Sequence, residues 1–79
     1  MLKLDIFKNI NGFLRAVNEC EGPVHLLRAD GGKENINKQY GIQNELVKKY
    51  MENKNCLRVS LDIPKPKDYL SIVSYYIGE

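Results

Sequence analysis

The sequence predicts a single small α+β domain, residues 1–79, in which two helices and several strands share one hydrophobic core. Residues 57–63 alternate apolar with polar side chains, which is typical of a half-buried strand. Residues 10–20 instead repeat apolar side chains at helical spacing. The run Asp30-Gly31-Gly32 is a hairpin-turn signal and favours antiparallel pairing of its flanking strands.

The chain is expected to begin with a strand and a helix. Residues 2–7 alternate, and their apolar side chains share one face: Leu2, Leu4 and Ile6. Residues 9–22 have the apolar stripe of a helix, formed by Ile10, Phe13, Leu14, Val17 and Cys20. Asn9 or Asn11 can cap the start of this helix, and Gly22 with Pro23 ends it.

A hairpin and a second helix follow. PVHLLRA, residues 23–29, predicts a strand, and residues 33–36 predict a short return strand after a two-residue turn. Residues 37–55 predict a helix with the apolar stripe Leu46, Val47, Tyr50 and Met51. Gly41 disfavours helix, so an alternative start lies at or after it. Glu45 and Lys49 have the spacing of a favourable ion pair on a helix.

The C-terminal part holds the clearest strand and the most ambiguous segment. Residues 56–63 predict a strand that Pro64 and Pro66 end. The last run, DYLSIVSYYIG, has apolar residues at helical spacing, but its Ile, Val and Tyr content favours a strand. We predict a strand that pairs back on residues 56–63. Tyr75 and Tyr76 would then point to opposite faces, with at least one in an interface.

The predicted order is therefore β-α-β-β-α-β-β. Its first six elements match the ferredoxin-like arrangement, in which two helices cover one face of an antiparallel or mixed sheet. The seventh element would extend an edge of the sheet or pair across a dimer. In this topology the unpaired edge of the seventh element is where a partner strand would bind.

Composition excludes several functional classes. No apolar run approaches the length of a membrane span, and the N-terminus lacks a signal-peptide pattern, so we expect a cytoplasmic protein with no membrane partner. Cys20 and Cys56 do not form a Cys-x-x-Cys motif, which indicates free, buried thiols. His25 is the only histidine, and a pair with Cys20 lacks an orienting third group. We predict no enzyme activity, catalytic residue, metal or cofactor.

INKQYGIQNELVKKY, residues 36–50, resembles the helix-turn-helix family in its spacing of apolar residues around Gly41. On that resemblance Gln43 and Asn44 would begin a recognition helix and contact adenine, while lysines would reach phosphates: Lys38, Lys48 and Lys49. Arg58 belongs to a locally basic stretch that could join them, or that simply faces solvent. Asn37 departs from the small residue usual in the family.

NINGFLRAVNEC, NKNCLRVSLDIP and DYLSIVSYYIG resemble segments of a group of short uncharacterised bacterial proteins from Gram-positive genomes and mobile elements. The resemblance implies an independent, intracellular bacterial domain and carries over no functional residue. The function we expect is a small interaction or adaptor module that acts by homodimerisation or by binding another protein. Its interface residues would be Tyr69, Tyr75 and Tyr76, because tyrosine is enriched at interfaces. Nucleic-acid binding through residues 36–50 is the alternative.

Overall fold

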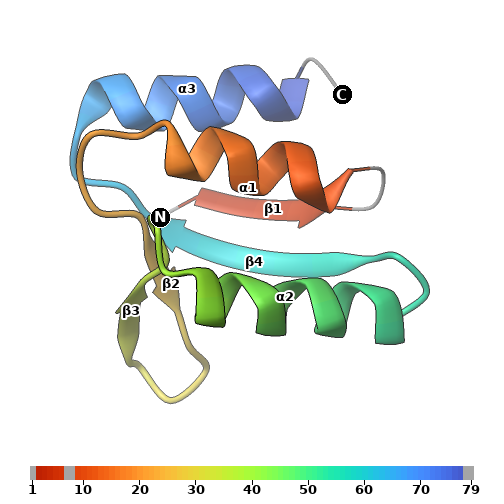
Figure 1. Cartoon of the computed structure of the whole chain (residues 1–79). Helices are drawn as coiled ribbons and strands as arrows, with labels where there is room; N and C mark the ends of the chain where they lie inside the picture. Colours follow the sequence, from red (N-terminus) through yellow and green to blue (C-terminus); the bar gives the residue numbers. More distant parts are fainter. Residues whose placement is uncertain (1, 7–8, 78–79) are drawn as a thin grey trace.

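The computed structural model describes residues 2–6 and 9–77 (Figure 1). Its strands are β1 (Leu2–Ile6), β2 (His25–Leu27), β3 (Lys33–Asn35) and β4 (Leu57–Asp62). Its helices are α1 (Ile10–Asn18), α2 (Tyr40–Glu52) and α3 (Pro66–Ile77). The α+β class is confirmed, and the element order agrees with the prediction up to β4.

The four strands form one antiparallel sheet in the order β1-β4-β2-β3. The exact ferredoxin-like topology is not matched, because β4 rather than β3 lies between β1 and β2. The described residues also contain a third helix where the prediction had two. The hairpin strands β2 and β3 are only three residues long. The six-residue strand β4 pairs with both β1 and β2 and so connects the two sides of the sheet.

The hydrophobic core lies between one face of the sheet and the helices. Leu4 pairs with Val59 in the register of β1 and β4, and both are buried on this face. The helices contribute three of the six largest fully buried side chains, Phe13, Val17 and Ile72. The opposite face of the sheet is polar and carries ion pairs of Arg58 with Asp5 at 2.8 Å and of Lys33 with Asp62 at 3.0 Å.

Helix α1 forms as its sequence predicts. All five residues of the predicted stripe are buried: Ile10, Phe13, Leu14, Val17 and Cys20. The side chain of Asn9 caps the helix by accepting a hydrogen bond from the Gly12 amide at 2.9 Å. The helix ends at Asn18, ahead of the predicted stop at Gly22, so Cys20 lies in the following turn.

The predicted hairpin is present, but its connection is longer than the predicted two residues. Residues 28–32 join β2 to β3, and the Arg28 amide donates to the Gly32 carbonyl at 2.9 Å. Among the described glycines only Gly31 has a positive φ, of 89°. A type I′ turn needs two consecutive positive φ angles, so the turn prediction is corrected to a wider loop.

The prediction of a strand after Pro66 is wrong, because residues 66–77 form α3. Pro66 occupies the first helical position, where its fixed φ and missing amide are favourable. Asp68 in the first turn suits the positive end of the helix dipole. Ile72 is fully buried, so the helical spacing of the apolar residues decided the outcome over their β propensity. Tyr75 and Tyr76 therefore do not alternate across a sheet.

Helix α2 is shorter than predicted. It starts at Tyr40, which places Gly41 inside its first turn, and it ends at Glu52. The residue with a left-handed backbone before this helix is Lys38, with φ of 60°, and not Gly41. Within the predicted stripe Leu46 and Tyr50 are buried, whereas the side chain of Met51 is 66% exposed. Residues 36–39 therefore form a turn, without the first helix of a helix-turn-helix.

Candidate functional site

The sheet is split between its two central strands. β2 pairs with β4 at two positions only, His25 with Asp62 and Leu26 with Leu61. The same register places Leu27 opposite Ser60, but this pair is not part of the ladder, which ends at Leu26 and Leu61. β4 nevertheless continues along β1 over residues 57–61. Residues 57–60 are therefore paired with β1 on one edge and lie outside the ladder with β2 on the other.

The alternation of main-chain direction shows which groups face the split. In a strand, successive residues turn their N–H and C=O groups to opposite edges. The carbonyl of Val24 accepts from the Ile36 amide at 2.9 Å, so residues 24, 26 and 28 turn toward β3. Leu27 therefore turns its main chain toward β4 and into the split.

The same alternation applies to β4. His25 turns its main chain toward β4, so its partner Asp62 turns toward β2. Ser60 and Arg58 follow at two-residue spacing and turn the same way. Because Leu26 and Leu61 turn away from each other, their pairing is made by the residues that flank them, which engages the Leu27 amide with the Ser60 carbonyl. Beyond this bond, the amide of Ser60 and both main-chain groups of Arg58 face the split outside the ladder with β2.

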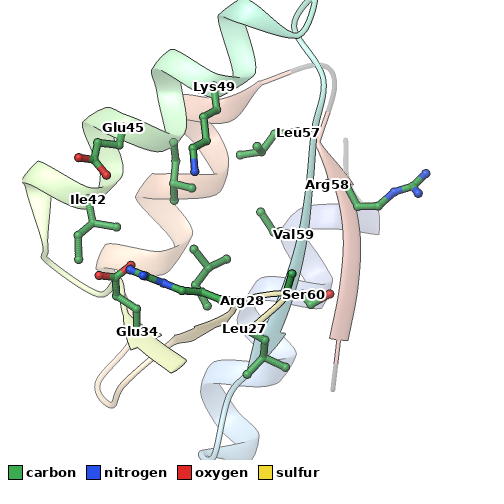
Figure 2. Close-up of a pocket in the computed structure, with 13 residues that line it drawn as sticks. Leu27, Arg28, Glu34, Ile42, Glu45, Lys49, Leu57, Arg58, Val59 and Ser60 are labelled. Atoms are coloured by element: carbon green, nitrogen blue, oxygen red, sulfur yellow. The ribbon is translucent and has the colours of Figure 1, made fainter. Parts of the chain in front are cut away.

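A groove of about 520 Å³ occupies this split, between α2, β4 and the β2–β3 hairpin (Figure 2). It is lined by Leu26, Leu27, Arg28, Ala29, Glu34, Ile42, Glu45, Leu46, Lys49, Leu57, Arg58, Val59 and Ser60. Figure 2 shows the side chains of Arg58 and Ser60 pointing away from the groove. These two residues therefore line it with their main chain, as the alternation requires.

The floor of the groove is apolar. It consists of core-facing side chains of β4 and side chains of α2, of which Leu57, Val59 and Leu46 are buried. Ile42 and Leu26 are half-buried beside them. A floor of this kind accepts an apolar group, because covering it removes hydrocarbon surface from water.

Charged side chains border the groove on two sides. On the hairpin side Arg28 is paired with Glu34, whose hydrogen bond raises the pKa of the guanidinium. On the α2 side the predicted pair of Glu45 with Lys49 is not formed, and Lys49 has no ion-pair partner among the described residues. Figure 2 shows the side chain of Lys49 extending over the groove. This ammonium is therefore a positive charge still available to a ligand.

The three predicted interface tyrosines all belong to α3 but differ in their surroundings. Tyr75 is half-buried and packs against the core: its hydroxyl donates to the Asn9 carbonyl at 2.6 Å, and its ring lies 6.2 Å from that of Phe13. Tyr69 and Tyr76 are 40% and 36% exposed and lie seven residues apart on one side of the helix. Leu70 is 62% exposed and forms an apolar strip with these two tyrosines. The prediction named the two tyrosines but not Leu70.

The predicted nucleic-acid contacts do not form one surface. Gln43 is buried, and its amide nitrogen donates to Asn18 Oδ1 at 2.7 Å and to the Ile36 carbonyl at 2.8 Å. Arg58 points from the open face of the sheet, where it pairs with Asp5. The remaining four residues are exposed along α2 and the turn before it: Lys38, Asn44, Lys48 and Lys49. Of the six, only Lys49 and Arg58 line the groove.

Two buried polar side chains, for which we predicted no structural role from the sequence, connect the loops at one end of the sheet. Asn37 donates to the carbonyls of Cys20 at 2.9 Å and Gly22 at 2.7 Å. Asp68 accepts from the amides of Glu21 at 3.1 Å and Gly22 at 2.9 Å. These bonds hold the segment between α1 and β2 against α2 and α3. The position of Asp68 two residues after Pro66, which is typical of the start of a helix, was the sequence signal that could have predicted this role.

The two cysteines are not joined by a disulfide in the structure. Cys20 and Cys56 are free; Cys20 is buried and Cys56 is half-buried. Burial, followed by the charge of Asp68, raises the pKa of Cys20 to about 11, so its thiol is protonated at neutral pH. It donates to the Ala16 carbonyl at 3.3 Å, and no hydrogen bond joins it to His25. Over residues 2–6 and 9–77 no three His, Cys, Asp or Glu side chains gather as metal ligands.

Comparisons with known proteins found no matching family model, no matching curated protein and no matching solved structure. Among the described residues, no helix has the length and apolar character needed to cross a membrane. The groove is therefore interpreted from its own chemistry.

Proposed function

We propose that this protein is a small interaction module that holds a segment of a partner protein in the groove between α2, β4 and the hairpin. The observation that carries the proposal is the split between β2 and β4. It places main-chain hydrogen-bonding groups beside an apolar floor. Exposed strand edges of this kind are recurrent sites of protein association.

The other forms of the proposal have less support. Homodimerisation is supported by the apolar strip of Tyr69, Leu70 and Tyr76 on α3, since exposed apolar surface favours contacts. Nucleic-acid binding is supported by the lysines of α2, but Gln43 is committed to the interior. The groove is the feature that combines shape, apolar surface and free polar groups.

A selection experiment tests the groove. Linear dodecapeptides displayed at random are selected against the immobilised full chain, and the enriched peptides are titrated by fluorescence anisotropy. We expect Ile42→Arg to weaken binding by about tenfold or more, because the new guanidinium covers the apolar floor. The matched control is Val47→Arg, because Val47 is also half-buried on α2 but does not line the groove.

Two results contradict the proposed function. One is a selection that enriches no peptides for the wild-type chain. The other is a set of peptides that bind equally well to both arginine variants, provided circular dichroism shows both variants folded. Equal retention would place the binding surface elsewhere on the molecule.

A further inference from the structure

The mode of binding follows from the geometry of the split, if the proposed function holds. We propose that the partner segment is an extended peptide that pairs as an added strand with the free edge of β4 at Arg58 and Ser60. An acidic side chain of this peptide lies against Lys49. A helical partner is a different proposal and is one of the outcomes of the test below.

The free edge of β4 requires hydrogen-bonding groups from its ligand. Arg58 presents its N–H and C=O toward the split and Ser60 presents its N–H, because β1 takes up the alternate residues Leu57 and Val59. A helix satisfies its own main chain and offers nothing to such an edge. An extended segment presents donors and acceptors at the same spacing, as in strand addition.

The length of the site is limited at both ends. At one end β2 closes on β4 at Leu61 and Asp62, and at the other β4 begins at Leu57. The available edge is therefore residues 57–60, which is enough for a short segment and too short for a long strand. Such a limit favours a peptide motif over the edge of another sheet.

The floor determines which side chains the segment carries. Side chains of an added strand alternate between the two faces of the sheet. One face continues the surface of Val59 and Leu46, which is apolar, and the other continues the polar face of Ser60. The segment therefore has apolar residues at alternate positions, with polar residues between or beside them.

Charge complementarity selects an acidic neighbour. Arg28 is already neutralised by Glu34, whereas Lys49 and, one turn before it, Glu45 line the groove without an ion-pair partner among the residues described. The acidic residue of the peptide therefore belongs at the Lys49 end of the groove. A carboxylate beside the apolar anchor gives Lys49 a charge-assisted hydrogen bond in a site partly shielded from water. A basic residue at that place meets an unpaired like charge and is disfavoured.

Hydrogen exchange of the free full chain tests the open edge before any ligand is added. We expect the amides of Ser60 and Arg58 to exchange much faster than those of Val59 and Leu57, which bond to β1. Protection of Ser60 equal to that of Val59 would mean that the edge is closed and would overturn the proposal. This readout does not depend on whether a peptide has been found.

The peptides selected above, labelled with fluorescein, then test the pairing. Ser60→Pro removes the amide that faces the split and leaves the pairing with β1 intact, since that amide does not point to β1. We expect about tenfold weaker binding to Ser60→Pro and unchanged binding to Ser60→Ala, which keeps the amide. Exchange at Ser60 and Arg58 should slow when peptide is bound.

Lys49 gives a second measurement that survives if Ser60→Pro fails to fold. We expect Lys49→Glu to weaken peptides with an acidic residue by about tenfold, and a Lys replacement in the peptide to restore part of the loss. Lys48→Glu is the matched control, because Lys48 is exposed on the same helix outside the groove.

The outcomes separate the two proposals. Binding that depends on Ile42 but is unchanged by Ser60→Pro and Lys49→Glu, or a bound peptide shown to be helical, overturns strand addition and leaves the interaction function standing. Failure to select any peptide overturns both proposals.

Discussion

At the scale of single residues, a few buried amides and one carboxylate hold the loops together. Asn37 contacts two carbonyls of the segment that joins α1 to β2. Its own Oδ1 is buried without a hydrogen-bond partner. A buried side chain with two bonds to the main chain is costly to remove, because both acceptors lose their donor.

The first prediction concerns Asn37. We expect Asn37→Ala to lower the free energy of unfolding by about 2 kcal/mol, because the carbonyls of Cys20 and Gly22 lose their donor. Urea denaturation followed by circular dichroism measures the loss. Asn44→Ala is the matched control, since Asn44 is exposed on α2 and should change stability by less than about 0.5 kcal/mol. Equal effects of the two substitutions would contradict this role.

At the scale of elements, α3 depends on a contact made at its first turn. Asp68 accepts hydrogen bonds from the amides of Gly22 and Glu21, and these bonds lower the pKa of its carboxyl below 3.8. A carboxyl with a lowered pKa in the folded state stabilises the fold above its unfolded pKa. That stability is lost as the pH falls through the folded value.

This contact predicts a pH dependence. We expect Asp68→Asn to be less stable than wild type at pH 7, with a difference that shrinks as the pH falls below about 3.8. Urea midpoints at pH 7 and pH 3 measure both differences. Asp30→Asn is a useful comparison, because Asp30 accepts only from the exposed Gly32 amide of its own loop. A difference between wild type and Asp68→Asn that does not change with pH would refute the role of Asp68.

At the scale of the whole molecule, the exposed strip on α3 predicts the oligomeric state for the homodimer form of the proposal. Light scattering after size exclusion should then rise from 9.1 kDa toward twice that mass with concentration. Leu70→Glu should keep the protein monomeric, because it places a charge in the apolar contact. Met51→Glu is the control, since Met51 is similarly exposed on α2. A monomer at every concentration would exclude homodimerisation and would leave the groove unaffected.

Prediction from the sequence reached the elements whose periodicity is unambiguous. The stripe of α1 and the alternation of β4 each allow one structure, because the period of their apolar residues fits only one. Residues 66–77 carried two signals, and the prediction followed composition instead of the Pro66 and Asp68 start. Of the site, Leu46 and the apolar face of residues 57–63 were predicted to face the core, and Lys49 and Arg58 were predicted for a different partner.

The sequence by itself determined the α+β class, the first six elements and most of the core, because these depend on side chains within a few residues of one another. In the last segment, whose helical spacing and β propensity disagree, the tertiary structure supports the helix through Asp68, which accepts from the distant amides of Glu21 and Gly22. It also decided that β2 leaves β4 after two pairs, and so created the groove. Strand register and the separation of strands depend on packing between segments that are distant in the sequence. The local periodicity of apolar residues therefore does not predict them.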